Sequence, residues 1–194
     1  MSSGKRNSNN PSGRPLSHEV TERIYAAVFQ LIAQGSYQSV SMDAVAAAAG
    51  VSRPALYRRY SGVGPLTLSA LQAVGGDVLP MAYSSDAGRD IADYLKLLAE
   101  VLSEESVIGQ ALRGALASAL VDPKLGREFA QFIEIRRVPV RDRLLEWDAS
   151  LSPKQLDAIL DSLFGPVLYR LLIRGVPIDE GQVGEIVGRS LGKW

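Results

Sequence analysis

The residues best suited to chemistry in this 194-residue chain are arginines, tyrosines and serines between Ser41 and Tyr60. Arg53, Tyr57 and Arg58 are spaced so that they can share the exposed side of one short helix. An arginine guanidinium forks onto guanine O6 and N7 or binds a phosphate, and a tyrosine hydroxyl bonds a phosphate. These residue types at this spacing favour contact with a polyanion.

Two short helices must position these side chains. Ser41 is a good N-cap for the first helix, and Gly50 supplies the backbone freedom of a tight turn. Ser52 can cap the second helix, where Pro54 falls in the first turn. We therefore predict a helix-turn-helix whose second helix lies in the major groove, with Pro54 against a thymine methyl or sugar and both serines near phosphates. An antiparallel helix pair with a solvated basic face is the alternative.

Charge is unevenly distributed along the chain, although its net value is zero. Residues 1–60 hold seven basic and three acidic residues, and the remainder holds 14 and 18. Residues 1–16 are too polar to bury a core, so we expect a flexible arm. Its cations, Lys5, Arg6 and Arg14, make it either an inert tail or a strap that reaches DNA.

The composition excludes several other classes of protein. The chain has no cysteine and one histidine, His18, so disulfides and thiolate metal sites are excluded and a Ser-His-Asp triad is hard to build. No apolar run approaches the ~20 residues of a membrane span, and the N-terminus lacks the apolar core of a signal peptide. We expect a soluble, cytoplasmic protein that is not an enzyme and uses no cofactor or metal.

Apolar periodicity predicts an all-α chain of about nine helices. Beyond the first three, the expected helices cover residues 66–79, 91–102, 107–120, 122–144, 153–174 and 179–191. Pro139 should kink or split the long helix that begins at Asp122-Pro123.

The segment YQSVSMDAVAAAAGVSRPALYRRY resembles the DNA-binding motif of the tetracycline-repressor (TetR) family of bacterial transcription regulators. The matching positions are Gly35 with Tyr37, Ser41, Val45-Ala46, Ala49-Gly50-Val51-Ser52, and Leu56-Tyr57-Arg58 with Tyr60. The resemblance implies that Ser41, Ser52, Arg53, Tyr57 and Arg58 contact DNA. It departs from the family at Val63, where a lysine usually meets a phosphate.

The C-terminal half resembles a TetR-type regulatory domain through Asp122-Pro123 and through Leu163-Phe164-Gly165-Pro166 with Tyr169-Arg170-Leu171-Leu172. The resemblance implies a DNA-binding domain at residues 17–77, with its motif at 41–60, and a ligand-binding and dimerisation domain at residues 78–194. The last two helices would form a four-helix bundle with those of a second copy, since they carry more apolar surface than one pair can bury. The expected interface residues are Leu156, Ile159, Leu163, Val167, Leu171, Val183, Ile186 and Val187.

The aromatic residues of this half are candidates to line a ligand pocket: Tyr83, Tyr94, Phe129, Phe132, Trp147, Phe164 and Tyr169. Helical aromatics are more often core than pocket. The function we expect is a homodimeric repressor that binds a palindromic operator on double-stranded DNA and responds to a small apolar effector. The alternatives are an activator or global regulator without an effector, and an enzyme or drug-sequestering protein on a similar helical scaffold.

Overall fold

The helices begin and end where local sequence signals place them. The computed structural model describes residues 18–192, without the side chains at positions 76 and 77. Over this range the α-helices are α1 His18–Gln34, α2 Met42–Ala49, α3 Arg53–Tyr57, α4 Val63–Val78, α5 Ala87–Val101, α6 Val107–Val121, α7 Pro123–Trp147, α8 Pro153–Leu168 and α9 Glu180–Leu191. Nine α-helices and no strand in the described range confirm the predicted all-α class.

Side-chain caps account for several of these boundaries. The Oγ of Ser41 accepts a hydrogen bond from the Ala44 amide at 3.2 Å at the start of α2, and Ser152 forms a capping box with Gln155 at the start of α8. Two helices begin earlier than predicted, α4 at Val63 instead of Leu66 and α5 at Ala87 instead of Ile91. Helix α7 continues through Pro139 without splitting.

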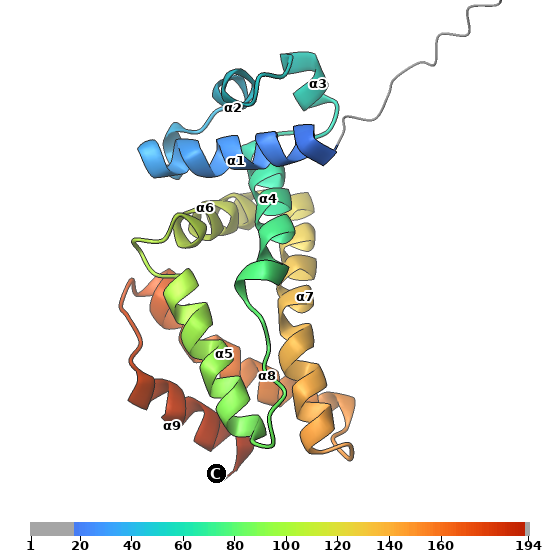
Figure 1. Ribbon diagram of the computed structural model, residues 1–194, viewed down its shortest axis with the longest axis vertical. Coiled ribbons are helices and arrows are strands. Elements are labelled where there is room, and N and C mark those ends of the chain that lie inside the picture. Colours follow the sequence, from blue (N-terminus) through green and yellow to red (C-terminus); the bar gives the residue numbers. More distant parts are fainter. Residues whose placement is uncertain (1–17, 193–194) are drawn as a thin grey trace, which may run out of the picture.

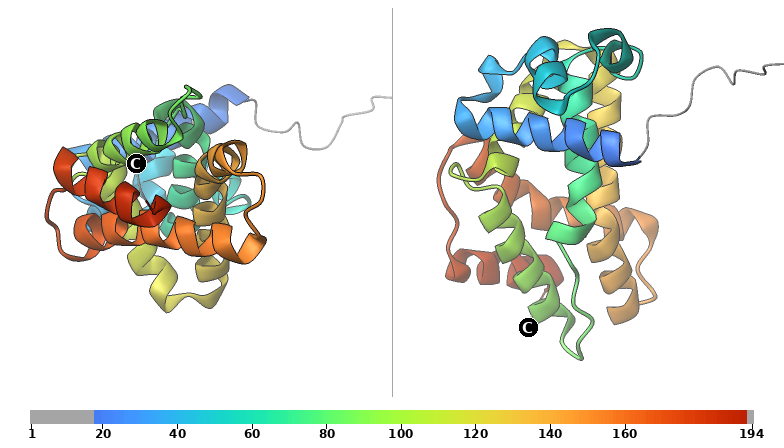
Figure 2. Two further views of the ribbon diagram at one scale, coloured as in Figure 1. Left: turned by 90° about the horizontal axis from the view of Figure 1, so that it is seen from below. Right: turned by 45° about the horizontal axis from the view of Figure 1, so that its top comes forward.

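The helices form two regions that share one continuous core (Figure 1). Helices α1, α2 and α3 make up one end of the molecule, which we call the head. Helix α4 leads out of the head and packs against α6 and α7, while α5, α8 and α9 lie towards the opposite end (Figure 2). Because α4 also contacts α1, it belongs to the packing of both regions.

A buried ion pair holds the start of α5 against α7. The Nε of Arg143 donates to Asp90 Oδ2 at 2.8 Å, and both side chains are almost fully buried. Burial alone would raise the pKa of Asp90, but hydrogen bonds from Ser84 and Arg143 outweigh it and hold that pKa below its ordinary value. The pair is therefore ionised and hydrogen-bonded inside the core.

In the described range, no helix is long and apolar enough to span a membrane. The same residues contain no cluster of three or more histidine, cysteine, aspartate or glutamate side chains that could hold a metal ion.

Candidate nucleic-acid interface

The turn between α2 and α3 sets the angle of the two helices. Gly50 adopts a left-handed conformation (φ 65°), and its amide donates to Ala47 O while the Val51 amide donates to Ala46 O. Only glycine adopts this conformation readily. Leu56 of α3 and Val45 of α2 are fully buried and fix the short second helix against the first.

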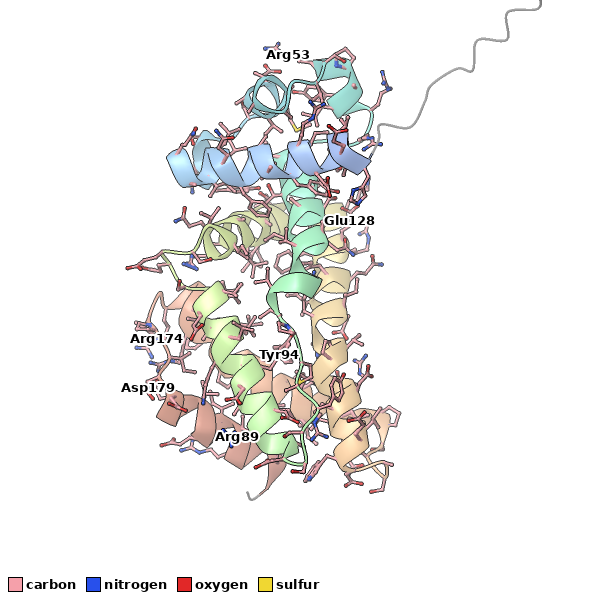
Figure 3. All side chains as sticks on the ribbon, viewed as in Figure 1. Arg53, Arg89, Tyr94, Glu128, Arg174 and Asp179 are labelled. Atoms are coloured by element: carbon pink, nitrogen blue, oxygen red, sulfur yellow. The ribbon has the colours of Figure 1, made fainter. Side chains whose placement is uncertain are left out.

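The side chains predicted to meet DNA lie on the exposed side of this helix pair. Arg53, Pro54, Tyr57 and Arg58 are all exposed, as are the two serines, Ser41 and Ser52, that precede the helices. Figure 3 shows Arg53 at the outer end of the head. Ser52 makes no side-chain capping hydrogen bond within the described residues. Lys5, Arg6 and Arg14 of the predicted arm lie outside the described residues.

Arg53 is joined to a residue that the sequence did not single out for DNA contact. Its Nε lies 2.9 Å from Oδ1 of Asp43, with 66% and 47% of the two side chains exposed. Asp43 lies in the first turn of α2, where a negative charge is also favourable to the helix dipole. The ion pair links α2 to α3 through Nε and holds the guanidinium of Arg53 beside the exposed face.

The residues that follow α3 fasten it to α1. Arg59 Nη1 donates to Thr21 Oγ1 at 2.9 Å. The Tyr60 hydroxyl donates to the Tyr25 hydroxyl at 3.2 Å, and the two rings meet edge to face with centroids 6.5 Å apart. Burial, assisted by the hydrogen bond with Tyr60, raises the pKa of Tyr25 well above its ordinary range. These contacts make the head a rigid support for the exposed face of α3.

The head is also fixed to α6. The Tyr37 hydroxyl lies 3.0 Å from Ser118 Oγ. A Cβ atom on Gly114 would lie 2.1 Å from the Tyr37 ring, so the ring packs directly on the backbone of α6.

At the start of α4, a Cβ on Gly64 would lie 2.6 Å from Leu125 of α7. Val63, at the position of the family's lysine, is partly buried against the core and offers no cation there.

A cavity of about 60 Å³ lies between α4, α5, α6, α7 and α8. Its wall is apolar apart from Arg136 and Arg137. Of the aromatic residues predicted to line a pocket, Phe132 and Phe164 do so. Tyr94 packs edge to face on Phe164 with ring centroids 6.4 Å apart.

Five of the seven predicted pocket residues, Tyr94 among them, do not line this cavity. Phe129 is buried against Phe132, with ring centroids 5.9 Å apart. Tyr83, Trp147 and Tyr169 have side chains that are about half exposed. Trp147 is the last residue of α7, and Tyr169 opens the π-helical turn Tyr169–Ile173 after α8. Tyr83, in the loop before α5, lines a separate surface pocket together with Tyr94, Arg136 and Pro139.

The predicted dimer residues separate into two groups. Six are buried within the single chain: Leu156, Leu163, Val167, Leu171, Val183 and Val187. The other two, Ile159 and Ile186, are partly exposed and line a surface groove between α8 and α9 together with Ala158, Ser162, Pro166, Arg189 and Ser190.

Comparison with known proteins places both regions in one family. Residues 84–189, more than half of the chain, match "Tetracyclin repressor-like, C-terminal domain", and residues 24–62 match "Bacterial regulatory proteins, tetR family". The chain is 24% identical over 179 residues to the uncharacterized HTH-type transcriptional regulator YdeS of Bacillus subtilis (strain 168), covering 90% of this chain and 89% of YdeS.

Solved structures share the fold. The TetR family transcription regulator SCO0332 superposes with a TM-score of 0.75 at 26% identity, covering 91% of this chain and 99% of SCO0332. The multidrug binding protein EbrR, solved with ethidium, superposes with a TM-score of 0.62 at 23% identity, covering 90% and 98% of the two chains. The chain therefore belongs to the tetracycline-repressor (TetR) family and is a DNA-binding transcription regulator, not an enzyme.

Proposed function

We propose that this protein is a ligand-responsive repressor that binds a palindromic operator as a homodimer. Each protomer would place α3 in a major groove, with half-sites ~34 Å apart or a multiple of that distance. Arg53 and Arg58 would contact bases or phosphates, while Pro54 and Tyr57 would contact a thymine methyl, the sugar or a phosphate. Ser41 and Ser52 would meet phosphates at the starts of α2 and α3. The shared exposure of these six side chains supports the assignment.

The groove between α8 and α9 is the surface that we propose for the dimer. Small residues surround Ile159 and Ile186, and added Cβ atoms on Gly165, Gly184 and Gly188 would meet no neighbouring atom within 4 Å in the single chain. Small side chains allow the helices of two copies to approach closely, as a four-helix bundle requires. Tyr169 and Ile173, in the π-helical turn that follows α8, are exposed apolar side chains.

The observation that supports a ligand response is that α4 extends from the head to the cavity. This helix starts six residues after α3 ends, and its later turns, from Leu71 to Val78, form part of the cavity wall. A ligand that changes the wall therefore acts on the helix that leads into the head. Two proteins of this fold have names that mention ligands: the flavonoid-responsive regulator FrrA and EbrR with ethidium. A coupling of about 1–3 kcal/mol between the sites would be typical.

The proposal is tested in three steps. Genomic DNA fragments retained by the purified protein are sequenced, and footprinting on the recovered sites must show two symmetric half-sites. A reporter driven by such a site must rise when the protein is deleted, whereas an activator would lower it. A melting screen with small apolar molecules must then find a stabilising ligand that also releases the DNA. A protein that binds the sites and is stabilised by no ligand is a regulator without an effector.

A further inference from the structure

Arg136 is a cation in the wall of the apolar cavity, and the proposed DNA contacts and dimer make no use of it. Its guanidinium lies over the Phe132 ring, with Cζ 5.1 Å from the ring centroid. Burial lowers the pKa of Arg136 from its ordinary value, because desolvation disfavours the charged form. An arginine nevertheless stays protonated, so the cavity wall carries a positive charge.

The two buried arginines of α7 are neutralised by carboxylates. Arg137 pairs with Glu134, Asp157 and Asp161, and Arg143 pairs with Asp90. Among the residues whose side chains are described, no carboxylate lies within 4.0 Å of the Arg136 guanidinium. Its hydrogen-bond acceptors there are two backbone carbonyls of α4, at Leu71 (3.4 Å) and Gln72 (3.0 Å). A partly desolvated cation held only by neutral carbonyls is a favourable site for an anion.

Arg137, a second arginine of the cavity wall, has one nitrogen without an acceptor among the described residues. Arg137 lines the cavity and is 8% exposed. Its Nε is buried and makes no hydrogen bond to the described residues, although its other nitrogens bind carboxylates. Buried donors are nearly always satisfied in folded proteins, so an unpaired one calls for an acceptor. A ligand oxygen that reaches this side of the cavity would supply it.

From these groups we infer that the effector is a small apolar molecule with one carboxylate, which binds the Arg136 guanidinium while its apolar body fills the cavity. The inference rests on the proposed ligand response and names the chemical class of its ligand. By volume, a buried water needs roughly 10–15 Å³, so a cavity of about 60 Å³ holds about four to six waters before any wall moves. An acid with about four to six non-hydrogen atoms fills this volume, and a longer chain such as octanoate fits when the apolar side chains of the wall move apart.

The same arginine connects the ligand to α4. The guanidinium sits so close to that helix that a Cβ on Gly75 would lie 2.0 Å from Arg136 Cζ. A carboxylate competes for the N–H groups that now reach the carbonyls of Leu71 and Gln72, and a charged acceptor forms the stronger bond. Binding therefore loosens the hold of α7 on the later turns of α4.

The experiment compares ligands of one length and different charge on the full-length protein. Octanoate, 1-octanol and octylammonium, each below its aggregation limit, are titrated by calorimetry and by thermal melting. Octanoate should bind and raise Tm, whereas the alcohol should bind at least about tenfold more weakly and the amine should not bind, because one charge-assisted hydrogen bond is worth about that factor. Equal affinity for octanoate and 1-octanol, or preference for octylammonium or ethidium, would overturn the inference.

Variants test whether Arg136 is the residue that binds the carboxylate of the ligand. Arg136→Gln should weaken octanoate binding about tenfold to a hundredfold and leave 1-octanol binding unchanged. Gly75→Ala, which keeps the arginine but displaces its guanidinium, should weaken octanoate binding in the same direction. Arg127→Gln removes an exposed arginine from the same helix and should bind octanoate like the wild type. Full octanoate affinity in Arg136→Gln would refute the assignment.

The outcomes separate this inference from the function on which it rests. If a neutral or cationic ligand releases operator DNA and octanoate does not bind, the ligand response stands and the carboxylate class is wrong. If no ligand of any charge binds, both fail together.

Discussion

Replacing Asp43 by asparagine tests whether Arg53 works at the DNA interface. The carboxylate holds Arg53 through Nε at 2.9 Å, and both side chains are largely exposed. An exposed ion pair of this kind is worth about 0.2–1 kcal/mol. In Asp43→Asn the whole charge of Arg53 becomes available to phosphate. Over two protomers the gain is about 0.4–2 kcal/mol, or roughly 2- to 30-fold tighter binding to random-sequence DNA.

The operator should respond differently from random DNA. Asp43 leaves both Nη groups of Arg53 available to fork onto a guanine, so losing the carboxylate also loses that orientation. We therefore expect operator affinity to rise less than random-DNA affinity, or to fall, and the ratio of the two to decrease. The slope of log K against log salt should steepen by about 0.9 for each added phosphate contact, about 1.8 for the dimer.

Fluorescence anisotropy on both DNAs, from about 50 to about 200 mM salt, measures these quantities. Asp93→Asn is the matched control, because it removes an exposed, ion-paired carboxylate on α5, away from the head. Its salt slope and affinities should stay near those of the wild type. If Asp43→Asn also behaves like the wild type on both DNAs, Arg53 does not reach the DNA and the proposed interface is wrong.

Three further changes test the remaining parts of the proposal. Tyr57→Ala should weaken operator binding about tenfold to a hundredfold while light scattering still gives the wild-type mass; unchanged affinity would remove Tyr57 from the interface. Ser162→Arg places a long cation in the groove between α8 and α9 and should give a monomer by light scattering, whereas Ala130→Arg on the exposed face of α7 should not; a dimer in both would move the interface elsewhere. Asp90→Asn removes the buried counter-charge of Arg143, which keeps only the exposed Glu146 at 3.6 Å, and should lower the free energy of unfolding by about 3–5 kcal/mol. Because the folded-state pKa of Asp90 is lowered, its stabilisation is present above pH ~4 and is lost as pH falls through that lowered pKa. Urea melts at several pH values should show this acid-dependent loss in the wild type and little of it in the variant.

Local signals explain why the helices were predictable from the sequence. Ser41, Gly50 and Pro54 act through the backbone of their own or the next few residues, so the helix-turn-helix could be located before any tertiary contact was known. Helix α7 does not split at Pro139, because it packs against several neighbours. This packing sustains a helix whose local hydrogen bonding is interrupted.

The functional surfaces were harder to predict because they depend on contacts between distant residues. Asp43 and Arg53 lie ten positions apart in two different helices, and Arg136 meets Leu71 from 65 positions away. Apolar periodicity finds the buried face of a helix, and the residues that it selected in α8 and α9 include Leu163 and Val187, which are buried within the single chain. The groove that we propose for the dimer contains glycine, alanine and serine residues of α8 and α9, and these small residues give no apolar periodicity.

Two helices, and not α4 alone, connect the cavity to the head. Ile108 and Leu112 of α6 line the cavity, while Gly114 and Ser118 of the same helix hold Tyr37. If a ligand moved α4 and the head but not α6, the Tyr37 ring would have to slide over the backbone of α6. That ring packs directly on Gly114, so there is no space for such a movement. Packed interfaces of this kind resist continuous deformation. We therefore expect α4, α6 and the head to move as one unit, so that a ligand alters the distance between the two recognition helices of a dimer more than the shape of either head.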